Sequence, residues 1–147
     1  MISVAQLLEK KGKEVWTVSM DSLVIDCIKA MDEKNVGALP VVDGDSKLVG
    51  IISERDVSRK ILLSGRSPQQ CVVKEIMTES VVLTHTDQAI DECMVLMNEN
   101  HVRHLPVLDG DQLAGMISIG DVVKEIIEEQ QYTIRNLEGN ISWAESY

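Results

Sequence analysis

The chain has 147 residues, of which 44% are apolar, and it carries a formal net charge of −10. This length fits a single domain that buries about 70% of its unfolded surface; since either half alone would be marginal, we expect one joint core. The negative charge disfavours nucleic acid and anionic membranes as partners, and no apolar run approaches the roughly 20 residues that span a bilayer.

The cysteines Cys27, Cys71 and Cys93 form an odd set without C-x-x-C spacing. Such a set favours buried thiols over a disulfide framework or a metal site, and therefore a reducing environment. The first residues lack the basic and apolar regions of a secretory signal. We therefore expect a cytoplasmic protein. Because the chain has no Phe, an aromatic platform for RNA bases is also missing.

The first half of the chain predicts a helix, followed by a strand, a second helix, a hairpin and a third helix. Asp21 or Ser22 would cap the second helix, and Pro40 must lie where no ladder donor is needed, such as an edge or the start of a strand. The expected elements are a helix at 3–10, a short strand at 15–18, a helix at 22–34, strands at 38–42 and 47–52, and a helix from Ser53 to the linker at 65–68.

The second half repeats this order, so that Pro106 follows Pro40 by 66 residues and Gly115 follows Gly50 by 65. The expected elements are a strand at 81–84, a helix at 87–99, strands at 104–108 and 112–117, and a helix from 119 to about 137. Each half is thus β-α-β-β-α. A duplicated unit normally buries its apolar face against its own copy, and the seam between the copies is a natural place for a ligand.

The residues after 137 form a polar tail that carries Trp143 and Tyr147. These two aromatic side chains would either pack across a dimer partner or belong to a flexible terminus.

A Gly-apolar-apolar-Ser-x-x-Asp motif occurs at 50–56 and again at 115–121, where a strand ends and a helix begins. The unpaired N–H groups of a helix N-terminus suit a phosphate, and an Asp one turn later can accept hydrogen bonds from a ribose diol. Ser-x-x-Asp is also a shortened capping box. Gly120 lies in the first turn of the second such helix, where Gly costs roughly 1 kcal/mol against Ala, which indicates that something approaches the backbone closely.

The duplicated β-α-β-β-α unit, the Leu39-Pro40-Val41-Val42-Asp43 segment, the repeated motif and the linker phrase at 73–78 together resemble a tandem pair of CBS domains, or Bateman module. The resemblance implies an α/β (α+β) fold in which two pseudo-twofold-related repeats pack sheet to sheet, with an extra N-terminal helix and a C-terminal tail. The implied divisions are a first repeat at 8–65, a linker at 66–80, a second repeat at 81–137 and a tail at 138–147.

The resemblance further implies two clefts at the seam that bind adenosine-containing ligands, AMP foremost, with ATP, NAD and S-adenosylmethionine as alternatives, and no prosthetic group. Each cleft would combine the Ser-x-x-Asp of one repeat with the segment that leads into the central strand of the other. One cleft would use Ser53, Arg55, Asp56, Val102, Arg103, His104 and Leu105. The other would use Ser118, Asp121, Thr17, Val36, Gly37, Ala38 and Leu39.

The differences between the repeats predict unequal clefts. Arg55, Arg103 and His104 gather around Asp56, where Arg can contact phosphate with both of its donors, whereas the equivalents of these three residues are Gly120, Gly37 and Ala38. Thr17 likewise corresponds to Leu83. The cleft around Asp56 would therefore favour the more highly charged ligand.

By the same resemblance the chain is a regulatory, energy-sensing module that pairs into homodimers and acts on an unknown protein target. We expect no catalytic residues, because no Ser or Cys has an identifiable base partner, and no metal site, because His101-x-x-His104 lacks a third ligand. A structural scaffold with vestigial clefts and a cryptic nucleotide hydrolase stay open as alternatives.

Overall fold

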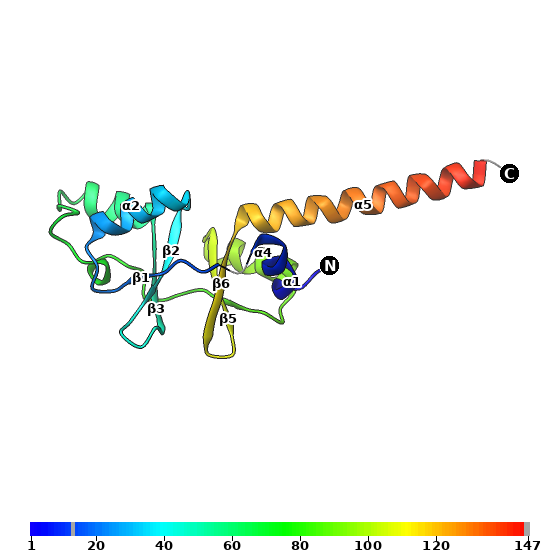
Figure 1. Ribbon diagram of the computed structural model, residues 1–147. Coiled ribbons are helices and arrows are strands. Elements are labelled where there is room, and N and C mark those ends of the chain that lie inside the picture. The colour runs from blue at the N-terminus through cyan, green and yellow to red at the C-terminus, as the bar shows by residue number, and fades with distance from the viewer. Residues whose placement is uncertain (13, 146–147) are drawn as a thin grey trace.

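The computed structural model describes residues 1–12 and 14–145, and the side chains up to residue 139. Two β-α-β-β-α repeats follow one another (Figure 1), preceded by the helix α1 (Val4–Lys11). The first repeat comprises β1 (Val18–Ser19), α2 (Val24–Lys34), β2 (Ala38–Val42), β3 (Leu48–Ser53) and α3 (Glu54–Val57), which continues as the π-helix η1 (Ser58–Leu62). The second repeat comprises β4 (Thr84–His85), α4 (Ile90–Asn100), β5 (His104–Asp109), β6 (Gln112–Ser118) and α5 (Ile119–Glu145), and the 3₁₀ helix η2 (Val73–Glu75) lies between the repeats.

Each repeat forms a three-stranded mixed sheet, in the orders β1-β2-β3 and β4-β5-β6. Pro40 lies in the middle of the central strand β2 and not at an edge or at the start of a strand, yet it lies where no ladder donor is needed, as expected. The physical reason is the shortness of β1, which pairs only with Val41 and Val42 and leaves Pro40 without a strand on that side. The same arrangement recurs around Pro106, since β4 reaches only Val107 and Leu108.

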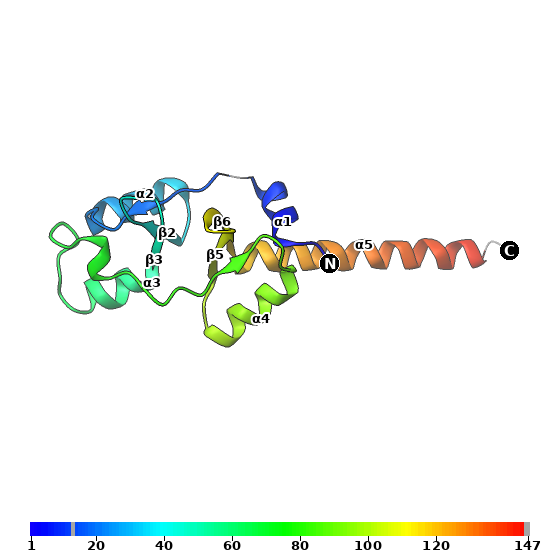
Figure 2. The same cartoon turned by 90° about the horizontal axis from the view of Figure 1, so that it is seen from below.

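The two sheets lie side by side in the middle of the molecule, with α2 and α4 on the outer sides (Figures 1 and 2). The buried apolar residues form two clusters, one for each repeat, so the expectation of one joint core is wrong. The first cluster consists of Val18, Val24, Cys27, Met31, Leu39, Val41, Ile52, Ile61, Cys71, Val73 and Ile76. The second consists of Val4, Leu7, Leu8, Ile90, Cys93, Met97, Leu105, Val107, Ile117 and Val122.

Each core is completed by the segment that precedes the other repeat in the sequence. The helix α1 precedes the first repeat but packs on the second, where the Leu8 side chain lies so close to Gly115 that a Cβ there would come within 2.7 Å of it. The linker around η2 precedes the second repeat but packs on the first. There, a Cβ at Gly50 would lie only 2.6 Å from the Sδ atom of Met77. The repeats are therefore tied together by two crossing segments, although their cores are separate.

The helix α2 begins without the side-chain cap that was predicted from Asp21 or Ser22. Its cap residue is Leu23, which makes no side-chain hydrogen bond. The first amides of the helix donate to carbonyl oxygens of the linker instead. Val24 N donates to Cys71 O at 2.9 Å, and Ile25 N donates to Pro68 O at 3.0 Å. Tertiary packing thus replaces a local cap.

The last helix, α5, is longer than the predicted 119 to 137, because it continues to Glu145. The residues expected to form a polar tail are therefore helical up to that point. Trp143 and Tyr147 lie outside the residues whose side chains are described. No helix within the described ranges is long and apolar enough to cross a membrane.

Candidate functional site

The two Ser-x-x-Asp motifs are both reciprocal capping boxes at the start of a helix. Ser53 N donates to Asp56 Oδ2 at 3.0 Å, and Asp56 N donates to Ser53 Oγ at 3.2 Å. Ser118 N donates to Asp121 Oδ2 at 2.8 Å, and Asp121 N donates to Ser118 Oγ at 3.2 Å. The capping interpretation is thus confirmed for both motifs.

A cleft of about 460 Å³ lies between the repeats beside the first motif. Both repeats and the linker contribute to its walls. The lining residues are Gly37, Ala38, Ile51, Ser53, Glu54, Arg55, Asp56, Arg59 and Lys60 from the first repeat, Thr78, Ser80 and Val82 from the linker and the residues after it, and His101, Val102, Arg103 and His104 from the second repeat.

The register of the sheets places the segments that lead into β2 and β5 beside the two motifs. Ala38 pairs with Ser53 and His104 pairs with Ser118. These two segments also meet each other across the seam, because His104 Cε1 lies 3.4 Å from where a Cβ at Gly37 would be. Gly37 and Ala38 consequently line the cleft beside Asp56, whereas the sequence predicts them in the cleft beside Asp121.

The carboxylate of Asp56 is nearly buried and has partners on both oxygens. Its Oδ1 accepts a hydrogen bond from Thr78 Oγ1 at 3.1 Å and forms an ion pair with Lys60 Nζ at 3.0 Å, while its Oδ2 serves the capping box. Lys60 Nζ also donates to Ile76 O at 2.9 Å. Donors from the chain itself therefore satisfy both oxygens of this carboxylate.

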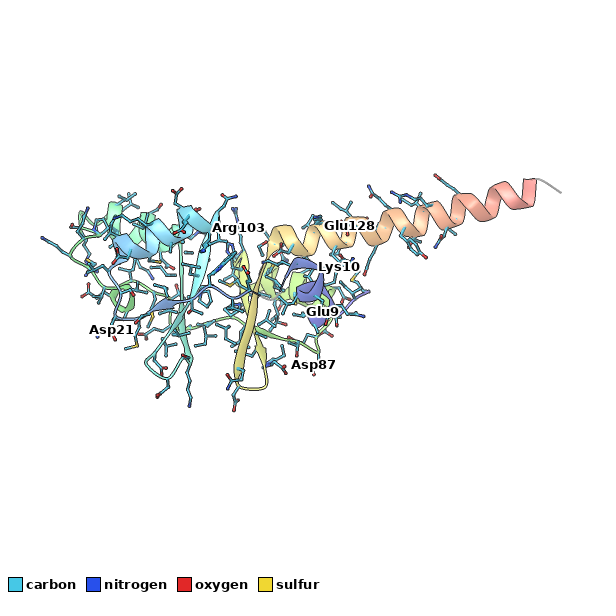
Figure 3. All side chains as sticks on the ribbon, in the orientation of Figure 1. Glu9, Lys10, Asp21, Asp87, Arg103 and Glu128 are labelled. Carbon is cyan, nitrogen blue, oxygen red and sulfur yellow. The ribbon has the colours of Figure 1, made fainter. Side chains whose placement is uncertain are left out.

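Four cationic side chains line the cleft, namely Arg55, Arg59, Lys60 and Arg103, against the two acidic ones of Glu54 and Asp56. Figure 3 shows Arg103 at the junction of the two repeats. The locally positive balance stands out in a chain with a net charge of −10. The arrangement suits an anionic group held between the repeats.

Sequence reasoning missed Arg59, Lys60 and Thr78 as lining residues. Lys60 follows Asp56 by one helical turn, a spacing at which an ion pair could have been anticipated. Thr78 belongs to the linker phrase at 73–78, but its place beside Asp56 depends on the bridge between Ile51 and Thr78, which is a tertiary contact.

Around the second motif, the aspartate is paired with a lysine from α1. Lys11 Nζ lies 2.7 Å from Asp121 Oδ2 and also donates to Met116 O at 2.7 Å. The adjacent Lys10 pairs with the buried Glu125 at 3.0 Å, and Figure 3 shows it beside α5. Partial burial acts to raise the pKa of Asp121, but the hydrogen bonds from Lys11 and Ser118 outweigh it and hold this pKa below its ordinary value.

His104 lies between the two motifs and is half-buried. Its pKa is lowered, mainly by burial and also by the positive charges of Lys11 and Arg103, while the negative charges of Asp121 and Glu54 act in the opposite direction. The imidazole therefore favours its neutral form near pH 7.

The remaining predicted residues have varied positions. Thr17 is exposed just before β1, and Val36 is half-buried beside the first core. Leu39 and Leu105 are buried in the two cores, so only their backbones can face a cleft. A Cβ at Gly120 would contact only Ser118 Oγ, at 3.6 Å, which is an ordinary van der Waals distance. Contacts within the described chain therefore do not require glycine at this position.

Comparison with known families finds that the model described as "CBS domain" matches residues 5–63 and 73–128. These two ranges correspond to the two structural repeats and together cover most of the chain.

Individual relatives agree with this match. A crystal structure of a candidate signal-transduction protein with CBS domains from Burkholderia ambifaria shares 49% identity, with a TM-score of 0.83 over 88% of this chain and 96% of that one. A mitochondrial CBS domain-containing protein of Arabidopsis thaliana is 36% identical over 95% of this chain and 71% of its own length. An inosine-5'-monophosphate dehydrogenase of Methanocaldococcus jannaschii is 38% identical over 76% of this chain, which spans only 22% of that enzyme.

Proposed function

Because the chain belongs to the CBS domain family and carries two repeats of it, we propose that it is a non-catalytic sensor of adenosine-containing ligands. AMP, ATP and NAD are the ligands that we put first. The ligand binds at the seam between the repeats, and the change in shape is passed to a partner protein.

The cleft beside Asp56 is the observation that carries the proposal. Its volume of about 460 Å³ lies within the usual range of roughly 300–1,000 Å³ for small-molecule sites. A ribose diol that hydrogen-bonds to Asp56 takes the place of Thr78 and Lys60, whose donors then become available to the ligand. Arg55 and Arg103 lie on the same walls, where they can hold phosphate oxygens.

The adenine fits the apolar part of the same cleft. Ile51, Val82 and Val102 line it, and aliphatic side chains can cover the two faces of a base where no aromatic residue is present. The backbone beside Ala38 and His104 would read the edge of the base. We propose that the four cations make this cleft the one that takes the more highly charged ligand.

Signalling follows from the fact that both repeats line the cleft. A ligand that contacts Asp56 of the first repeat and Arg103 of the second favours the arrangement in which these residues are close together. The output acts in trans on a target protein, and we propose that the chain works as a homodimer. The described cysteines are all free and buried, which supports a reducing cytoplasm as the compartment. Burial also raises the pKa of Cys27 to about 11, so this thiol stays protonated and unreactive.

The second candidate function is a scaffold whose clefts no longer bind. One observation favours it: both aspartates already form ion pairs with lysines of the same chain, Asp56 with Lys60 and Asp121 with Lys11. Titration calorimetry with AMP, ATP, NAD and S-adenosylmethionine separates the two functions, because a scaffold shows no heat of binding at millimolar ligand.

The Asp56→Ala variant tests the site itself. We expect the variant to lose at least tenfold in affinity for AMP, because the ribose diol loses its acceptor, while turnover of ATP with magnesium stays absent in both proteins. Asp45→Ala is the matched control, since Asp45 lies exposed in the hairpin turn. If Asp56→Ala binds AMP as the unchanged protein does, the ligand binds elsewhere.

A further inference from the structure

The helix α5 projects far beyond the second repeat (Figures 1 and 2). Its residues 131–139 are all exposed, so none of the side chains that the structure describes covers this part of the helix. A helical segment of this length is marginal on its own in water, because most helical stability in proteins comes from packing of an apolar face. Something is therefore expected to cover it.

An apolar stripe runs along α5 on a face that the domain does not use. It consists of Val123, Ile127, Ile134 and Leu137, which are between 37% and 57% exposed. Their spacing of three and four residues, with Gln130 in the remaining position, is that of the a and d positions of a coiled coil. This stripe is hereafter called the α5 stripe.

A separate face of α5 packs against the second repeat. Val122 and Ile126 pack in the second core, Glu125 binds Lys10, and Glu129 accepts a hydrogen bond from Ile2 N at 3.0 Å. The helix thus has two apolar faces, and intramolecular packing accounts for only one of them.

We propose that the α5 stripe packs against the α5 stripe of a second copy of this chain, with the two helices antiparallel. This adds a surface to the homodimer proposed above and does not depend on ligand binding. Among the antiparallel registers that heptad geometry allows, we place Ile127 against the partner's Leu137 and Gln130 against the partner's Ile134.

Charge complementarity supports the second copy and its orientation. In the antiparallel register Lys124 lies opposite the partner's Glu138, and the pair occurs twice by symmetry. Within the described chain, neither Lys124 nor Glu138 has a hydrogen-bond or ion-pair partner. In a parallel pair these positions would instead face Ile119 and Thr133, and no charge would be matched.

An anionic membrane is a poorer occupant of the stripe. Glu128, Glu129 and Glu138 lie on the same helix, and basic residues, not acidic ones, flank the apolar face of helices that bind such membranes.

Sedimentation velocity of the full-length chain tests the proposal. The unchanged protein is expected to be a dimer at micromolar concentration, and Ile134→Asp combined with Leu137→Asp is expected to weaken dimerisation at least tenfold, giving monomers. Tyr132→Asp is the matched control, because Tyr132 is exposed on α5 but lies off the stripe. A monomeric unchanged protein, or a double variant that stays a dimer of the same strength, overturns the proposal.

Charge exchange tests the orientation. Lys124→Glu and Glu138→Lys each place like charges opposite one another and should weaken the dimer, whereas the two changes together should restore it. Absence of restoration excludes the antiparallel register. AMP binding per chain should be equal in all these variants, so that failure of this inference is distinguishable from failure of the proposed ligand site.

Discussion

Asp56 and Asp121 occupy equivalent positions, yet each is paired with a lysine of different origin. Lys60 comes from the same helical segment as Asp56, one turn away, whereas Lys11 comes from α1, more than a hundred residues before Asp121. A ligand that bound Asp56 would therefore displace a local contact. A ligand that bound Asp121 would displace a contact that also holds α1 on the second repeat.

The Lys11→Met variant should lower stability at neutral pH and not in acid. The pKa of Asp121 is depressed in the folded protein, so its ion pair stabilises the fold above the unfolded pKa of about 3.9, and this contribution is lost as the pH falls through the lower folded value. Since both side chains are partly exposed, we expect a loss of about 0.5–1 kcal/mol at pH 7. The free energy of unfolding in urea, measured for the variant and the unchanged protein at pH 7 and at pH 2, tests the loss at neutral pH and its absence in acid.

Lys47→Met serves as the control for Lys11→Met, because Lys47 is exposed in the hairpin turn of the first repeat. A Lys11→Met variant that is as stable as this control at pH 7 would show that the ion pair contributes nothing.

At the level of elements, the two crossing segments hold the repeats together. The helix α1 inserts Val4, Leu7 and Leu8 into the core of the second repeat, and the linker around η2 inserts Val73 and Ile76 into the core of the first. Each repeat thus depends on the segment that precedes the other repeat in the sequence. Neither repeat has a complete core within its own β-α-β-β-α unit.

Leu8→Ala should destabilise the protein by roughly 2–5 kcal/mol, the usual cost of such a change in a core. Leu8 is 5% exposed and packs on Gly115, so the change leaves a cavity between α1 and the second sheet. The measurement is the free energy of unfolding in urea, with Leu63→Ala as the control because Leu63 is 81% exposed. Equal stability of the two variants would mean that α1 is not part of the core.

The duplicated pattern predicted the order of strands and helices well, because apolar periodicity and turn residues are local signals. It did not predict the position of Pro40 in a central strand, since the shortness of β1 becomes visible only in the sheet. Nor could it predict that linker carbonyls replace the cap of α2. The local pattern did not predict features that depend on contacts between segments distant in the sequence.

For the candidate site, the sequence led to Ser53, Asp56 and Arg103, which do line one cleft. It did not predict that Gly37 and Ala38 line this cleft as well, because it could not show that the segments leading into β2 and β5 contact each other across the seam. Whether these residues bind a ligand stays a prediction.

At the scale of the whole molecule, two separate cores enclose a shared cleft, and a helix extends from one end. This arrangement suits a sensor, because a ligand in the cleft contacts both halves, whereas a dimer through α5 would lie away from the cleft. Ligand binding and association could then be altered independently.

The Arg103→Ala variant tests the central claim most directly, because Arg103 comes from the second repeat while Asp56 comes from the first. Titration calorimetry should show a loss of at least tenfold in affinity for ATP and a much smaller loss for adenosine, since only the phosphates need the guanidinium. Equal affinity of the variant and the unchanged protein for ATP would contradict a ligand that bridges the two repeats.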